Sequence, residues 1–125
     1  MAANNVSPVV SERGHGYLVV LWEAMIADST GLPFTPPAGY DLESVQGFGT
    51  FDTSGEVDLE GSNVPGGSGT YAVLKDALGN DITLDAAALK TVLDVHSLYY
   101  RPKTAANGGT SAIDVDIYAL FRQRN

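Results

Sequence analysis

The chain has 125 residues, 44% of them hydrophobic, which fits one domain with a single buried core. Fifteen acidic against seven basic residues give a formal net charge of -8, which disfavours nucleic-acid binding because phosphate contacts need clustered Lys and Arg. No cysteine is present, so disulfide frameworks and thiolate metal sites are excluded, and the longest apolar run, residues 17–22, is too short to span a membrane.

The first sixteen residues predict an N-terminal arm, followed by a single domain over residues 17–125. The arm is small and polar and has no core face of its own. Val6, Val9 and Val10 are its only aliphatic β-branched side chains, too few to anchor it in the domain. We expect these three valines to bind a neighbouring subunit.

A first strand is predicted over residues 17–26, with Leu18, Val20, Trp22 and Ala24 on one side. Its other side is also largely apolar, which indicates a central strand or one covered by a partner.

A proline-rich connection follows over residues 27–43, too rich in proline for a helix or a paired strand. Leu32, Phe34 and Tyr40 are too apolar for a free loop. We expect them to pack either on the sheet or on a neighbouring subunit.

Residues 44–51 and 55–62 predict a β-hairpin across a turn at residues 52–55. Val57 and Leu59 alternate with acidic residues and are expected in the core, while the acids face water or a partner: Glu56, Asp58 and Glu60. Gly47 and Gly49 leave a groove in the first strand that an aromatic side chain from another strand could fill.

The remaining segments predict a short hairpin over residues 71–84, one helix over residues 85–92 and two further strands. Asp85 is a plausible N-cap for the helix, with three alanines behind it. A strand over residues 96–101 is expected to be broken by Pro102.

The last strand, residues 112–122, has two different faces. Its inward side chains are all apolar: Ile113, Val115, Ile117, Ala119 and Phe121. On the outward face, acidic residues give way to Tyr118 and Leu120 and then to Arg122. A face of this kind suits a protein partner, and we expect Tyr118 and Leu120 to bind one.

Seven or eight short strands with frequent turn signals predict an all-β fold. The expected architecture is an antiparallel β-sandwich or a partly closed, jelly-roll-like barrel with one short helix. Because both faces of the first strand and the outer face of the last are apolar, we also expect a homo-oligomer, in particular a trimer.

Residues able to carry chemistry are few, and we expect neither enzymatic activity nor a cofactor. His15 and His96 are the only histidines, and they lie far apart in the sequence. The alternating acids at 56, 58 and 60 and at 114 and 116 are typical of solvated strand faces, with a Ca²⁺ site between two such ladders as the alternative.

A resemblance extends over residues 17–122. It rests on the runs 59–63 (LEGSN), 71–76 (YAVLKD) and 100–102 (YRP), then on 107–109 (NGG) and a final alternating strand. This order resembles small structural proteins of tailed bacteriophages. The resemblance implies a non-enzymatic virion component, above all a capsid decoration (cement) protein that binds the major capsid protein at the capsid surface after assembly in the host cytoplasm.

Two alternatives remain beside this one. A phage tail or neck protein would share the fold and differ in its partner. The run 59–63 is also similar to discoidin-type jelly rolls, which implies a carbohydrate-binding module with an exposed aromatic platform among Tyr40, Tyr99 and Tyr100.

Overall fold

The computed structural model describes residues 4–51, 55–64, 69–92, 95–106 and 113–124. Within these ranges the strands are β1 (Asn4–Val6), β2 (Val9–Gly14), β3 (Tyr17–Ile26), β4 (Ser29–Gly31), β5 (Tyr40–Thr50), β6 (Gly55–Ser62), β7 (Ala72–Val73), β8 (Thr83–Leu84), β9 (Ala88–Thr91), β10 (Tyr99–Ala106) and β11 (Asp114–Gln123).

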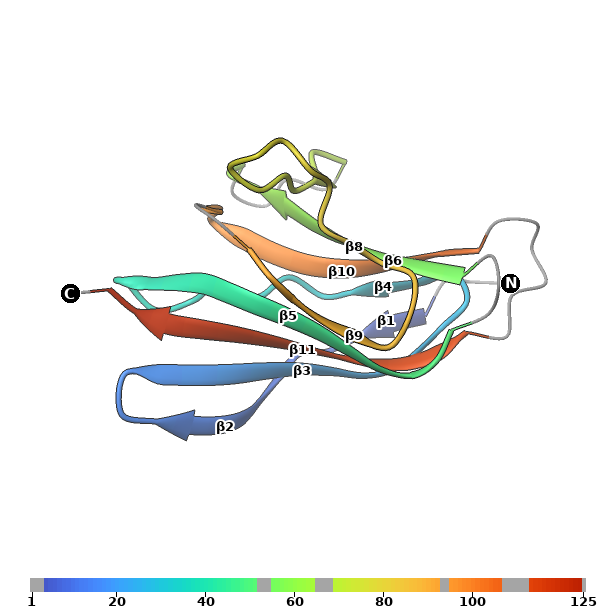
Figure 1. Ribbon diagram of the computed structural model, residues 1–125, viewed down its shortest axis with the longest axis horizontal. Helices are drawn as coiled ribbons and strands as arrows, with labels where there is room; N and C mark the ends of the chain where they lie inside the picture. Colours follow the sequence, from blue (N-terminus) through green and yellow to red (C-terminus); the bar gives the residue numbers. More distant parts are fainter. Residues whose placement is uncertain (1–3, 52–54, 65–68, 93–94, 107–112, 125) are drawn as a thin grey trace.

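The strands form two sheets, and all pairings but one are antiparallel. A six-stranded sheet has the order β1-β4-β10-β6-β7, with β8 also paired to β6, and β1 is parallel to β4. A five-stranded sheet has the order β2-β3-β11-β5-β9. Figure 1 shows the long strands of both sheets running in similar directions, with β2, β3, β11 and β5 as neighbouring ribbons. The predicted all-β class is therefore confirmed, as two sheets and not a closed barrel.

The core lies between the sheets and receives alternate side chains from both. The five residues of the last strand that the sequence placed inward are all buried. Val57 and Leu59 of β6 face them from the six-stranded sheet and are buried as predicted. The largest fully buried side chains are Trp22, Tyr100, Phe121, Leu18 and Met25. The two sheets thus share one continuous apolar core.

The N-terminal segment contributes an edge strand to each sheet. Strand β1 pairs with β4, the amide of Leu32 donates to the Val6 carbonyl, and the Val6 side chain packs against the core. Strand β2 pairs with β3 along most of its length. Residues 4–14 are therefore integrated in the domain through backbone pairing, although they contribute only Val6 to the core contacts.

The hairpin predicted between residues 44–51 and 55–62 is wrong. Strand β5 pairs with β11 and β9, whereas β6 pairs with β10, β7 and β8 in the other sheet. The alternation of apolar residues correctly assigned the faces of β6, but it carries no information on the pairing partner. The Phe51 ring fills the space beside Gly47. A Cβ on Gly47 would lie 2.8 Å from the Phe51 Cζ.

The predicted helix over residues 85–92 is also wrong, and no helix occurs in the described ranges. Ala88–Thr91 forms strand β9, which pairs with β5, and the Val92 amide donates to the Glu43 carbonyl. Leu84 and Val92 are buried and hold the segment at both ends. A two-turn helix is marginal on its own, so strand pairing against β5 outweighs the helix propensity of three alanines.

Strand β10 continues through Pro102, contrary to the predicted break. Pro102 is buried opposite Leu59 of β6. On the other side its ring lies against Gly31, where a Cβ would come within 2.5 Å of the Pro102 Cδ. Proline is accommodated because β4 is short and pairs with β10 only at Lys103.

Ala24 was predicted on the same side as Leu18, Val20 and Trp22, but it is exposed, and Met25 is buried with them instead. The β3–β11 register shifts between Val115 and Ile117, and a carboxylate oxygen of Asp116 accepts the Ala24 amide at 2.9 Å. Ala24 adopts a φ of 57°, in the left-handed region. This bulge moves the alternation of β3 by one residue at its end.

The edges of both sheets are short or irregular. Strands β1, β7, β8 and β9 each have two to four residues. Strand β2 is longer but contains a register shift between Val10 and Glu12, followed by the exposed charge of Arg13. Little regular backbone is left open for pairing with another chain.

Leu59→Ala tests the shared core. Leu59 is 3% exposed, so the substitution leaves a cavity and is expected to lower the free energy of unfolding by about 2–4 kcal/mol in urea denaturation. The matched control Leu78→Ala, at a position 74% exposed, should change it by less than about 0.5 kcal/mol. Equal losses would contradict the assignment of the core.

The integration of the N-terminal segment is tested by Val6→Ser and Val9→Ser. Val6 packs on the core, so Val6→Ser should lower the free energy of unfolding by about 1–2 kcal/mol. Val9 is 53% exposed, so Val9→Ser should lower it by less than about 0.5 kcal/mol. Thermal denaturation of both variants measures the difference. Two neutral variants would show that the segment does not stabilise the domain.

Candidate functional site

The outer face of the five-stranded sheet carries two rows of side chains in which apolar residues alternate with a few polar ones. The strand register places Val9, Leu21, Tyr118, Gln46 and Leu89 side by side across all five strands. The next row consists of Glu12, Val19, Leu120, Ser44 and Thr91. Alternation keeps both rows on the side away from the core.

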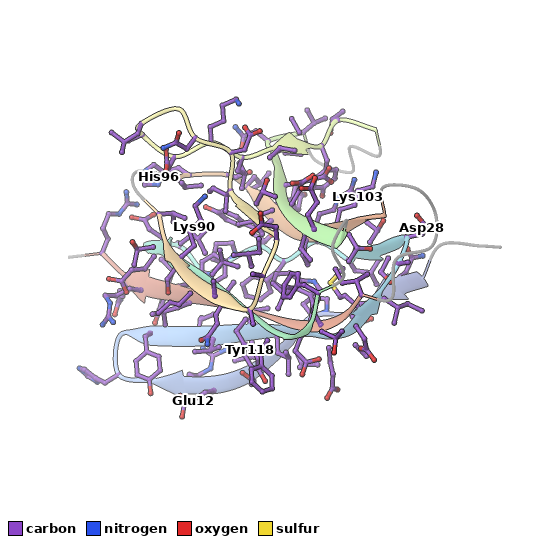
Figure 2. The ribbon with its side chains drawn as sticks, turned by 45° about the vertical axis from the view of Figure 1, so that its right-hand side comes forward. Glu12, Asp28, Lys90, His96, Lys103 and Tyr118 are labelled. Carbon is purple, nitrogen blue, oxygen red and sulfur yellow. The ribbon has the colours of Figure 1, made fainter. Side chains whose placement is uncertain are left out.

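Several of these side chains are open to solvent. Leu89 is 62% exposed, and Phe48, opposite Asp116 at the end of the apolar rows, is 64% exposed. A groove of about 310 Å³ lies in the face, lined by Val19, Ser44, Gln46, Leu89, Tyr118 and Leu120. Figure 2 shows Tyr118 and Glu12 on the same side of the molecule, near β2 and β3. Contiguous exposed apolar surface of this kind marks interaction sites in proteins.

The eight residues predicted to bind a partner divide into three groups. Tyr118, Leu120 and Val9 lie together on this outer face. Val10 and Leu32 are exposed outside its two apolar rows. The remaining three pack against the chain's own core: Val6, Phe34 and Tyr40.

Sequence reasoning missed Phe48 and Leu89. Leu89 was assigned to the predicted helix, where it had no sheet neighbours. Phe48 stands between Gly47 and Gly49, and only the pairing of β5 with β11 shows which face it shares. The strand alternation of β5 was the available signal, but without the sheet order it does not connect Phe48 to Tyr118.

A second, polar cavity of about 320 Å³ lies where β5, β11 and the segment around His96 meet. His96 Nδ1 is 3.2 Å from an Asp41 carboxylate oxygen, and Arg124 Nε is 3.2 Å from the other. Arg122 Nε lies 2.6 Å from Glu43. The charged side chains here pair with one another, which identifies an ion-pair network rather than an unsatisfied binding site. His15 lines an adjoining cavity with Gly16, and Arg122 and Gln123 line both cavities.

The two acidic ladders belong to different sheets, so they do not form the shared Ca²⁺ site considered from the sequence. No group of three or more His, Asp or Glu side chains close enough for a metal ion occurs in the part of the chain that the structure describes. Glu60, predicted to face water or a partner, is instead largely buried and accepts from Arg101 Nε at 2.9 Å. Arg101 also stacks on Tyr71, 3.8 Å from its ring centre.

The aromatic residues considered for a sugar site do not form one exposed platform. Tyr100 is buried, and its hydroxyl accepts from the Ser97 amide at 3.0 Å. Tyr40 is partly buried against the core, and Tyr99 is half-buried. The carbohydrate alternative therefore lacks the geometry that it requires.

Among the acidic residues, Glu56 has a carboxyl whose pKa the fold shifts. Burial in the sheet raises the pKa of its carboxyl above the usual 4.5, and the nearby carboxylates of Asp58 and Asp85 raise it further. The folded state therefore holds this proton more tightly than the unfolded chain, and stability falls as the pH rises through 4.5 and the raised pKa.

Glu56→Gln should therefore raise the melting temperature at pH 7, where Glu56 is ionised, by about 1–2 °C. Well below pH 4.5, where the carboxyl is protonated in both states, the two proteins should melt together. Thermal melts over this pH range provide the measurement. A variant that is less stable at pH 7 would refute the repulsive environment of Glu56.

No protein family, curated protein or solved structure matches the chain. No helix in the described ranges is long and apolar enough to cross a membrane. The geometry of the outer sheet face is therefore the main structural guide to function.

Proposed function

We propose that this chain is a non-enzymatic structural protein of a virion, in particular a capsid decoration protein that binds major capsid subunits at the capsid surface. The order of short motifs between residues 17 and 122 resembles phage structural proteins and supports this proposal. The two-sheet, all-β architecture is compatible with it.

The observation that carries the proposal is the apolar outer face of the five-stranded sheet. Its two rows include Leu21, Tyr118 and Leu120, and Phe48 lies beside them. Contact of apolar surface with water is unfavourable. Burying such a face against another protein is favourable by about 25 cal/mol for each Å² of apolar surface removed from water. A structural protein that works by assembly has a use for a face of this kind.

The position of His96 is consistent with a structural role. Its ring is tied to Asp41 on the exposed rim of the polar cavity, and the same carboxylate also binds Arg124. Asp41 and Arg124 thus belong to an electrostatic contact between β5 and the C-terminal segment. Such a contact stabilises the end of the sheet.

Copy number in purified particles tests the proposal. Quantitative mass spectrometry of particles from a host culture that produces this chain should find it in hundreds of copies, in a fixed ratio to the major capsid protein. Tens of copies or fewer would assign the chain to a tail or neck. Its absence from particles would refute a virion function.

A further inference from the structure

The outward residues of β11 follow a charge order that is complementary to itself. Along the strand they run acid, acid, apolar, apolar and base: Asp114, Asp116, Tyr118, Leu120 and Arg122. Arg124 follows directly beyond the strand. Counted from Ala119, each acid has a base at the same distance in the other direction, Asp116 against Arg122 and Asp114 against Arg124.

We infer that the outer face of the five-stranded sheet is covered by a second copy of this chain, packed face to face about a two-fold axis beside Ala119. A two-fold interface uses the same patch on both copies, so it requires a self-complementary surface. With the axis across the strands, the two β11 strands are antiparallel. Tyr118 of each copy then faces Leu120 of the other.

Charge selects this direction. In the antiparallel arrangement Asp116 of one copy meets Arg122 of the other, and Asp114 meets Arg124. A parallel arrangement would place acid on acid and base on base, which is unfavourable. Strand β3 adds a further negative charge at the acidic end of the face, since Glu23 is exposed there.

Arg122 and Arg124 also pair with Glu43 and Asp41 of β5, which lowers the net positive charge of this end, but the charged groups keep hydrogen-bonding capacity for these contacts. Arg122 and Arg124 each have one Nε donor engaged within the chain, and a guanidinium has five N–H donors. Asp116 accepts the Ala24 amide through one carboxylate oxygen only. The guanidinium-bearing side chains are also more than half exposed.

The size of the face indicates the strength of this pairing. Five strands give a width of about 19 Å, and the distance from residue 116 to residue 122 is about 20 Å along β11. These dimensions give about 400 Å² per copy, which is smaller than a standard-size interface and indicates weak, reversible pairing. We therefore expect association in the micromolar range, with the groove beside Tyr118 and Leu89 filled by side chains of the second copy.

This inference uses the same face as the proposed function, but it concerns the isolated chain and is tested in solution without virus particles. It also differs from the trimer expected from the sequence, in which a three-fold axis would join two different patches. Loss of particle binding with intact pairing would refute the proposed function alone. A chain that stays monomeric in solution but occurs in hundreds of copies on particles would refute this inference alone.

Sedimentation equilibrium of the full chain, at protein concentrations up to the high micromolar range, should give the mass of a dimer. Leu120→Lys introduces a charge beside the axis and should raise the dissociation constant by roughly 30-fold or more. Leu78→Lys, at an exposed site outside the face, should leave it unchanged. A monomer throughout, a trimer, or equal effects of both variants would overturn the proposal.

Cross-linking tests the antiparallel direction and remains informative if Leu120→Lys does not fold. The chain has no cysteine, so Asp116→Cys and Arg122→Cys each introduce a single thiol. A thiol cross-linker of about 10 Å, the usual spacing of packed sheets, should join the two variants when they are mixed. Each variant alone should not be joined to itself. Efficient self-linking of either one, or no linking of the mixture, would overturn the arrangement.

Discussion

The fold depends on one aromatic junction between the two sheets. The Phe121 ring of β11 lies edge-on to the Tyr100 ring of β10, with 5.2 Å between the ring centres. The Phe34 ring also packs on Phe121, with 5.5 Å between their centres. The Tyr100 hydroxyl donates to the Val95 carbonyl and accepts from Ser97, so this ring is held at its far end as well. Burial also raises the pKa of Tyr100, which keeps the hydroxyl protonated. Three separate segments meet at this point.

The junction also determines the surface of the molecule. Since side chains alternate along a strand, turning Phe121 and Ala119 inward turns Leu120 and Tyr118 outward. The six-stranded sheet covers only the inner side of the five-stranded sheet, so the fold has no layer left to cover the apolar outer side. The same alternation that buries Phe121 and Ala119 therefore leaves Tyr118 and Leu120 on a face that the six-stranded sheet does not cover.

The sequence was sufficient for the faces of the strands but not for their partners. Val57, Leu59 and Ile117 were assigned correctly because period-two alternation is local. The pairing of β5 with β11 joins residues far apart in sequence, so no local signal opposed the false hairpin. In residues 88–91 an intrinsic preference of alanine for helix was overridden by a vacant edge of β5. Tyr118 and Leu120 were found from the sequence, whereas Phe48 and Leu89 joined them only through the sheet order.

The bulge in β2 and the shortness of the other edge strands bear on how far association can proceed. Pairing through strand edges is open-ended, since each added sheet presents a new edge and the product is a fibre. Pairing through a self-complementary face ends when two copies have met. Where two copies pair through the outer face, association therefore ends at two, because the short or bulged edge strands offer little backbone for a further strand.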